Sequence, residues 1–293
     1  MAEGAPAGYR SQLRLGLLAL GRDRLALAGM IVIALVAIAA AAAPLISPYD
    51  PTVAHSEAGR LAPIGTPGHV LGTDGGGRDI LSRLIWGGRV SITVAVLPVL
   101  VSALGGLVLG LAAGMTGKWL SGFIMRSMDV LFAFPAVLLA LAVATILGPG
   151  MMNVMMAIAI VSVPYMTRVV YVETLSVRAS DYVEAARACG TPMSRLLVRE
   201  IVPNVMPSLI VYATTGIGGL IVLAAGLSFL GVGVQPPTAD WGIMTADGRV
   251  VLRNMPHIAT IPGVMVLIVA LAFNVAGDGI RDAMDPRRRS GHR

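Results

Sequence analysis

The segment SDYVEAARACGTP, from Ser180 to Pro192, is polar and charged in a chain that is otherwise strongly apolar. Hydrophobic residues make up 56% of the 293 residues and charged residues only 13%, and the mean hydropathy is +0.79. This composition is typical of a protein that crosses a membrane several times. The role of the polar segment therefore depends on where the apolar stretches around it cross the bilayer.

Uncharged stretches long enough to cross a bilayer, about 20 residues each, recur along the chain. The stretch 130–167 is too long for one straight crossing and contains LGPGMMN at 147–153, where Gly and Pro favour a turn. The predicted fold is therefore all-α and polytopic, with six transmembrane helices: 25–47, 90–117, two short spans within 130–167, 205–232 and 254–277.

The basic residues indicate which side of the membrane faces the cytoplasm. An even number of spans places both termini on one side, together with residues 118–126 and 168–203. That side carries 16 of the 22 Lys and Arg residues; the others are Arg60, Arg78, Arg83, Arg89, Arg249 and Arg253. We therefore expect both termini in the cytoplasm. The net charge of +6 follows from this asymmetry, so it gives no support for nucleic-acid binding.

The spans divide the chain into segments on alternating sides of the membrane. We expect a transmembrane core that contains a cytoplasmic loop, 168–203, and an extracytoplasmic loop, 233–256. The complete order is a cytoplasmic N-terminal segment 1–24, a first transmembrane helix 25–47, an extracytoplasmic segment 48–89, the core 90–277 and a cytoplasmic tail 278–293.

The cytoplasmic loop begins with signals for a short helix. Asp181 is predicted to be its N-cap, with Glu184 at the third helical position completing a capping box. Gly190 is predicted to end the helix, because glycine adopts the left-handed conformation at little cost.

A second helix is predicted to follow at once, with Thr191 as its cap and Pro192 in its first position. Pro203 and Pro207 are expected to break it before the fifth span. On local physics alone, the loop is a helical hairpin at the membrane surface that connects two spans.

Sequence signatures of catalysis or cofactor binding are missing. The one lysine, Lys118, lies in GMTGKWL, which lacks the spacing of a phosphate-binding P-loop. The glycine-rich GTDGGGRD, residues 72–79, also lacks the Lys-Ser/Thr pair and is interpreted as a flexible approach to a helix. The histidines at 55, 69, 257 and 292 are scattered, and Cys189 is the one cysteine. We therefore expect no catalytic residue, bound cofactor or metal in this chain.

The order of residues in the cytoplasmic loop resembles a specific family pattern. Glu184-Ala185-Ala186, followed by Gly190 and a helix that ends at Pro203, is similar to the EAA loop of ABC-importer permeases. The chain departs from that pattern at Glu200 and Val202. In that family the loop forms a coupling helix that docks in a cleft of the cytoplasmic ATPase subunit. The resemblance implies ATPase coupling by Asp181, Glu184, Ala185, Ala186, Gly190 and Pro203.

Three further stretches resemble the C-type subunit (DppC/OppC-like) of dipeptide/oligopeptide permeases. They are LGTDGGGRDILSRLIWGGRVSI (71–92), LSFLGVGVQPPTADWGIM (227–244) and AFNVAGDGIRDAMDPR (272–287). The resemblance implies a type I ABC importer permease fold that forms half of the translocation path for dipeptides or oligopeptides. Relatives that import nickel complexes, haem or other small solutes remain an alternative.

A partner-independent secondary transporter is an alternative of another class. Proton-driven carriers often need ionisable groups inside the membrane, and no predicted span carries one near its centre.

The family resemblance also implies a set of partners in a bacterial plasma (inner) membrane. These are a second homologous permease, two cytoplasmic ATPase subunits that use ATP and Mg, an extracytoplasmic solute-binding lipoprotein, membrane lipid and the peptide substrate. The outer motifs are the expected docking surface for the binding protein, with candidate residues Asp74, Arg78, Asp79 and Trp241. An alternative places Trp241 in the interfacial aromatic belt.

Overall fold

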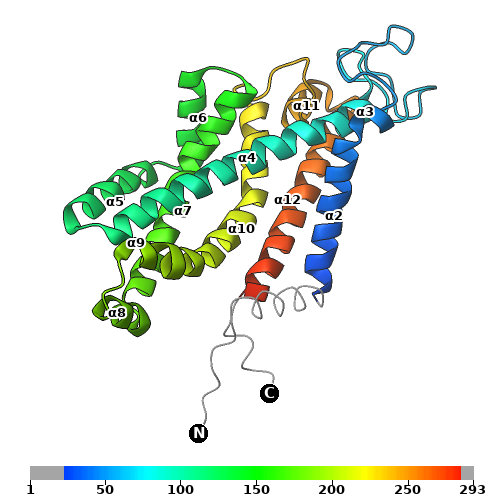
Figure 1. Cartoon of the computed structure of the whole chain (residues 1–293). Helices are drawn as coiled ribbons and strands as arrows, with labels where there is room; N and C mark the ends of the chain where they lie inside the picture. Colours follow the sequence, from blue (N-terminus) through cyan, green and yellow to red (C-terminus); the bar gives the residue numbers. More distant parts are fainter. Residues whose placement is uncertain (1–22, 285–293) are drawn as a thin grey trace.

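A computed structural model of the chain describes residues 23–284 (Figure 1). Within these residues the regular structure is helical, apart from two isolated β-bridges in the loop that precedes α4. The predicted N-terminal segment 1–24 and tail 278–293 fall partly outside the described residues.

The helices are arranged in two sets, long helices that form a bundle and short ones near its ends. The long helices are α2 (Arg24–Ala41), α4 (Ile80–Met115), α7 (Met151–Arg178), α10 (Val202–Phe229) and α12 (His257–Met284). The shorter ones are α3 (Ala43–Ile46), α5 (Lys118–Phe132), α6 (Ala136–Leu147), α8 (Asp181–Ala188), α9 (Met193–Leu196), a π-helical turn (Leu197–Ile201), α11 (Trp241–Gly248) and a 3₁₀ turn (Arg249–Val251).

Five of the described helices are long and apolar enough to cross a membrane, and a sixth crossing is broken. The first of the two short spans predicted within 130–167 contains α6, which follows α5 at an angle of 93°. Pro135 lies at this break; it lacks an N–H and disfavours helical geometry at Phe134. Six crossings therefore result only if the bent pair counts as one span.

Close packing of α4 against α7 forms the centre of the bundle. Gly106, Gly110 and Gly114 recur every four residues on α4, so they lie on one face of the helix. A Cβ atom added at Gly110 would lie 2.6 Å from the Cβ of Val170 on α7, and one added at Gly114 would lie 2.5 Å from a side-chain carbon of Thr174. This stripe of small residues lets the two backbones approach closely, as is common between helices in membranes.

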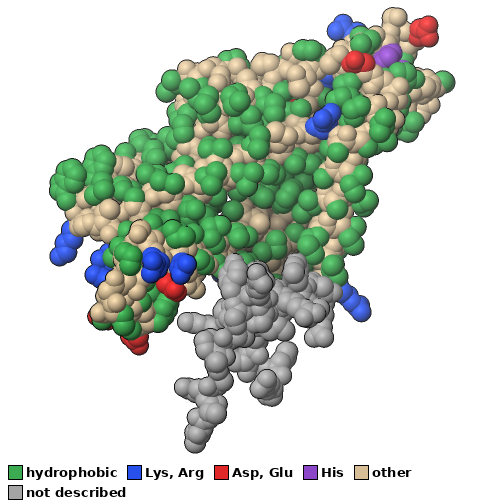
Figure 2. All heavy atoms as spheres, in the orientation of Figure 1, with side chains coloured by type: hydrophobic (Ala, Val, Ile, Leu, Met, Phe, Trp, Pro, Cys, Tyr) green, Lys and Arg blue, Asp and Glu red, His purple; other side chains and the backbone are tan. Residues whose placement is uncertain are grey.

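The two ends of the bundle differ in structure. The start of α2, the end of α12 and α8 lie at one end, while α11 and the loop between α3 and α4 lie at the other (Figure 1). Charged side chains gather toward both ends and the visible middle is mostly apolar (Figure 2). Within the predicted extracytoplasmic segment 48–89, the loop ends where α4 begins at Ile80.

Candidate functional site

The exposed helix α8 carries the residues predicted to couple to an ATPase. Its N-cap is Ser180, not Asp181, so the predicted capping box is wrong. The Ser180 carbonyl accepts from the backbone N–H of Glu184 at 3.1 Å, while its hydroxyl donates to the carbonyl of Val177 at 2.6 Å. Asp181 is thus the first helical residue. With Glu184 it places negative charge at the positive end of the helix dipole.

The turn after α8 has a fixed geometry. Gly190 ends the helix as predicted, with φ at +83°. Its N–H donates to the carbonyl of Arg187 at 2.9 Å, and the N–H of Thr191 donates to the carbonyl of Ala186 at 3.1 Å. These two bonds form a Schellman motif, which favours glycine at its left-handed position. The turn is therefore set by Gly190 and by backbone hydrogen bonds.

The second helix of the loop differs from the prediction at both ends. Its N-cap is Pro192 and no Thr191 side-chain cap forms. Pro203 and Pro207 do not break it: α9, the π-helical turn and α10 continue as one helical segment from Met193 to Phe229. Pro203 sits at the start of α10, directly after the π-helical turn, where the altered hydrogen bonding accommodates a residue without an N–H. A continuous helical rod therefore leads from the turn at Gly190 into the membrane.

Only one side chain of α8 is fully buried. Val183 packs inward, whereas Asp181, Glu184 and Ala185 are exposed and Ala186 is partly exposed. A short helix held by one buried side chain, with most of its surface open, is a suitable contact for another protein.

The loop that precedes α4 is an ordered structure, so its interpretation as a flexible approach is wrong. The Asp74 carboxylate accepts from the N–H groups of Gly76 and Arg78 at 2.8 and 2.9 Å and from the Arg78 guanidinium at 2.8 Å. It also lies 3.2 Å from the buried guanidinium of Arg83. Asp79 caps α4 by accepting from the N–H of Ser82 at 2.7 Å. Both carboxylates are therefore buried structural groups.

Two histidines that look isolated in the sequence come together in this loop. The rings of His55 and His69 are 5.1 Å apart, with Tyr49 against both, and His69 pairs with Asp79 at 2.9 Å. Within residues 23–284, no group of three or more His, Cys, Asp and Glu side chains could hold a metal ion.

Trp241 is buried, contrary to both expectations that placed it at a surface. Its exposed fraction is 1%, and its indole N–H donates to the carbonyl of Leu84 at 2.9 Å. Asp240 caps α11 and accepts from the Ser91 hydroxyl at 2.6 Å. Burial raises the pKa of Asp240, and the hydrogen bond from Ser91 lowers it by a smaller amount. Trp241 and Asp240 thus anchor α11 to α4.

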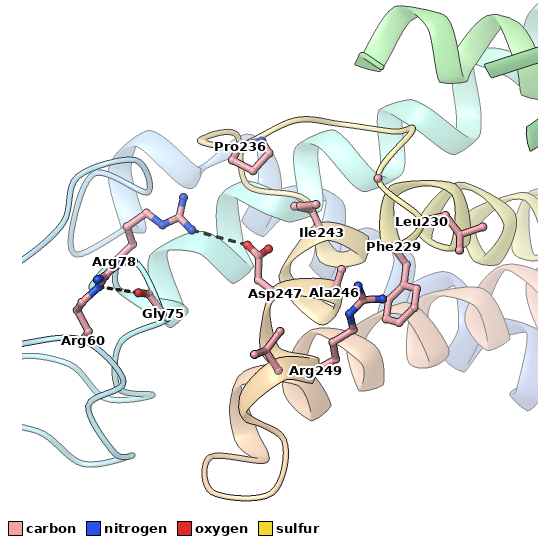
Figure 3. Close-up of a pocket in the computed structure, with 13 residues that line it drawn as sticks. Arg60, Gly75, Arg78, Phe229, Leu230, Pro236, Ile243, Ala246, Asp247 and Arg249 are labelled. Atoms are coloured by element: carbon pink, nitrogen blue, oxygen red, sulfur yellow. Dashed lines mark hydrogen bonds and ion pairs between the residues drawn. The ribbon is translucent and has the colours of Figure 1, made fainter. Parts of the chain in front are cut away.

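A pocket of about 580 Å³ opens beside α11, at the end of the bundle that holds the loop between α3 and α4 (Figure 3). Arg60, Arg78 and Arg249 contribute to its wall, whereas Asp247 is its one acidic side chain. Arg78 lies 3.8 Å from Asp247, and the Arg249 guanidinium sits 5.1 Å from the centre of the Phe229 ring. Burial raises the pKa of Asp247, and Arg78 opposes this shift. The sequence motifs pointed to this region, but Arg60 and Arg249 were not among the candidates.

Of the four candidate docking residues, only Arg78 lines the pocket. Asp74, Asp79 and Trp241 are buried within the chain and do not line the pocket. Since a buried side chain offers no contact to a partner, the exposed cations of the pocket are the better candidates for recognition.

The fold is shared with two solved ABC transporter structures. It matches the MetNI methionine ABC transporter in an inward-facing conformation, with a TM-score of 0.57, 17% identity and coverage of 70% of this chain and 98% of that chain. It also matches an amino acid ABC transporter, with a TM-score of 0.54, 18% identity and coverage of 71% and 94%.

Sequence comparison defines the family more closely. Residues 106–290 match the binding-protein-dependent transport system inner membrane component, and residues 11–63 match the N-terminal transmembrane domain of oligopeptide transport permease C. The chain belongs to this family of inner-membrane transport components. It is thus a multi-pass permease of the ABC-importer type, and the expected resemblance to DppC/OppC-like permeases is confirmed.

Curated relatives align over most of their length. A glutathione transport permease, GsiD, of Pectobacterium atrosepticum is 43% identical over 90% of this chain and 87% of its own. A di/tripeptide permease, DppC, of Pseudomonas aeruginosa is 40% identical over 90% and 89%. A dipeptide permease, DppC, of Alkalihalophilus pseudofirmus is 38% identical over 92% and 88%.

Proposed function

We propose that this chain is one of two permease subunits in an ATP-driven importer of small peptides. The relatives named above are permeases for dipeptides, tripeptides or glutathione, itself a peptide, and their alignments cover 90% or more of this chain. The substrate class shared by these relatives therefore favours peptides over nickel complexes or haem.

The single observation that carries the coupling role is the construction of α8. It leaves Glu184 and Ala185 exposed and is joined through the rigid turn at Gly190 to the helical segment 193–229. A movement of α8 that a partner causes is transmitted to α10, because the turn at Gly190 and the continuous helical segment connect them without a flexible linker. In this proposal two cytoplasmic ATPase subunits use ATP and Mg and bind α8, and this chain hydrolyses no ATP.

The orientation follows from the same contact. If α8 meets cytoplasmic ATPases, the start of α2 and the end of α12 also face the cytoplasm, in agreement with the predominance of basic residues on that side. The pocket beside α11 then faces outward. Its surplus of positive charge suits acidic side chains of a solute-binding lipoprotein.

Purification and uptake test this proposal together. The tagged chain should copurify with a second permease and two ATPase subunits, and the complex in proteoliposomes should import a labelled dipeptide only with ATP and the binding protein. Uptake by this chain alone would instead establish a partner-independent transporter.

A substitution at the turn tests the coupling role. Gly190→Leu should leave the bundle folded, because an added Cβ meets no atom within 4 Å, but it strains the left-handed turn. We expect the ATPase subunits to be lost or hydrolysis to continue without uptake. Gly122→Ala, at a helical glycine that is also free of close neighbours, is the matched control. Normal uptake by Gly190→Leu would contradict the coupling role.

A further inference from the structure

An ion pair and two aromatic rings form a cluster where α5 bends into α6. Arg168 of α7 lies 2.6 Å from the carboxylate of Asp129 on α5, and its guanidinium carbon is 4.4 Å from the centre of the Phe132 ring. Tyr165 packs edge-on against Phe132, with ring centres 4.6 Å apart. We call Asp129, Phe132, Tyr165 and Arg168 the inner cluster. Its two charged side chains remain 48% and 49% exposed.

The inner cluster lies near the inner boundary of the membrane-spanning part of the bundle, at the start of the predicted cytoplasmic loop 168–203. At 1.5 Å per residue, Arg168 is about 26 Å along α7 from its outer end, and the hydrocarbon core of a bilayer is about 30 Å thick. At this depth the two half-exposed charges are within reach of water at the inner membrane boundary.

A groove of about 420 Å³ runs between α6, α7 and α10 and meets the inner cluster. Tyr165 belongs to both, and Tyr212 faces the groove from α10. Gly216 and Gly219 keep its α10 wall open, since an added Cβ at either would meet no atom within 4 Å. Ser162 and Thr215 also line it and the rest of the lining is apolar, so the groove joins a mostly apolar surface with four hydroxyl-bearing residues to a pair of opposite charges.

We propose that the groove and the inner cluster form a transient binding subsite for the peptide during translocation. This proposal rests on the proposed function, because it requires a peptide substrate. A free peptide carries one ammonium and one carboxylate group, and the inner cluster offers one partner for each. Asp129 pairs with the ammonium group and Arg168 binds the carboxylate with its planar guanidinium, while the peptide side chains contact the groove.

When no peptide is bound, Asp129 and Arg168 pair with each other. Each charge neutralises the other, so the empty groove carries no unpaired charge at this end. The peptide exchanges one ion pair for two, and the exposed geometry allows this exchange without unfolding a helix. Such a site binds weakly enough to release its ligand, as transport requires.

The alternative occupant of this face is the second permease, with the ion pair acting only as a brace between α5 and α7. The two roles predict different results for Asp129→Ala/Arg168→Ala. A brace loses both charges together and leaves no unpaired ion, so uptake stays near the wild-type rate. A peptide subsite loses both of its charged contacts, so the apparent KM for uptake rises about tenfold or more.

The test uses the complete complex in proteoliposomes, with its binding protein and either radiolabelled dialanine or radiolabelled glutathione, whichever the wild-type complex imports. Copurification of the partners and binding-protein-stimulated ATP hydrolysis are measured for each variant. We expect both to be retained in Asp129→Ala/Arg168→Ala while the apparent KM rises. Asp129→Arg/Arg168→Asp keeps an ion pair but exchanges its ends, and Arg168→Lys keeps the charge without the planar fork. We expect the apparent KM to rise in Asp129→Arg/Arg168→Asp, and to rise by a smaller factor in Arg168→Lys.

Photo-crosslinking gives a direct measurement that does not depend on charge variants. A benzophenone amino acid in place of Tyr212 should crosslink the labelled peptide during ATP turnover, whereas the same group at Leu104, an exposed residue of α4 outside the groove, should not. Wild-type KM in the double variant together with no peptide crosslink at Tyr212 would overturn the subsite. If the wild-type complex imports neither peptide, the proposed function is wrong and the subsite fails with it.

Discussion

The indole nitrogen of Trp241 donates to the carbonyl oxygen of Leu84 at 2.9 Å, which joins α11 to α4 across 157 positions of the chain. The ring lies against Gly87 and Gly88, where an added Cβ would approach it to 3.1 Å at either position. The outer pocket therefore depends on a tryptophan that does not itself reach the surface.

Loss of this ring should destabilise the outer end of the bundle. Trp241→Ala is expected to lower the free energy of unfolding by about 3–5 kcal/mol, because it leaves a cavity and removes the hydrogen bond to Leu84. Thermal unfolding of the purified complex in detergent measures this effect. Trp119→Ala is the matched control, since Trp119 is 83% exposed, and an equal loss in both variants would contradict the anchoring role.

The sequence was sufficient for the all-α fold with its long apolar helices and for the turn at Gly190, because both depend on local properties. A long uncharged stretch predicts a membrane helix regardless of the segments that pack against it. A Schellman turn needs only one glycine at the right position. The bend of 93° between α5 and α6 was not predicted, because charge content does not report the angle between two helices.

The errors arose where packing or backbone geometry that the sequence patterns do not report decides the outcome. Pro203 does not break its helix because the preceding π-helical turn accommodates it, and proline content alone does not report that turn. Trp241 is buried because Gly87 and Gly88 leave room for it, although they lie more than 150 positions away. The inner cluster was missed for the same reason, since Asp129 and Arg168 meet only after α5 folds across α7.

The packing of α4 against α7 should be intolerant of added volume at Gly110. Gly110→Val would place its Cβ within 2.6 Å of the Val170 side chain, and the repacking is expected to cost about 1–3 kcal/mol or prevent folding. Gly105→Ala is the control at another glycine of α4. An added Cβ there would lie 3.5 Å from the side chain of Val163, an ordinary contact distance. Membrane yield and thermal unfolding of the two variants give the comparison, and equal values would exclude close helix approach as the cause.

The cap of α11 should make stability depend on pH. Because burial raises the pKa of Asp240, the native chain binds this proton more tightly than the unfolded chain does. The contribution of Asp240 to the free energy of unfolding is thus largest at low pH and falls as the pH rises through its native pKa. Asp240→Asn keeps a residue able to cap a helix but does not titrate.

The difference in unfolding temperature between wild type and Asp240→Asn isolates this group from other carboxyls. We expect that difference to shift in favour of the wild type as the pH is lowered from about 7.5 to 4.5. A difference that is constant with pH, or that shifts toward the variant, would show that the native pKa of Asp240 is not raised.

The outer pocket should recognise its partner through charge. Arg249→Glu reverses the sign of a side chain beside Asp247, so the concentration of binding protein that half-stimulates ATP hydrolysis is expected to rise about tenfold at low salt. The increase should shrink as salt is added, because exposed charges are screened over about 10 Å at 0.1 M ionic strength. Arg253→Glu, at an exposed arginine outside the pocket lining, controls for net charge on the same end of the bundle. Equal responses to the two substitutions would mean that the pocket itself is not the contact and that only the overall charge of this end attracts the binding protein.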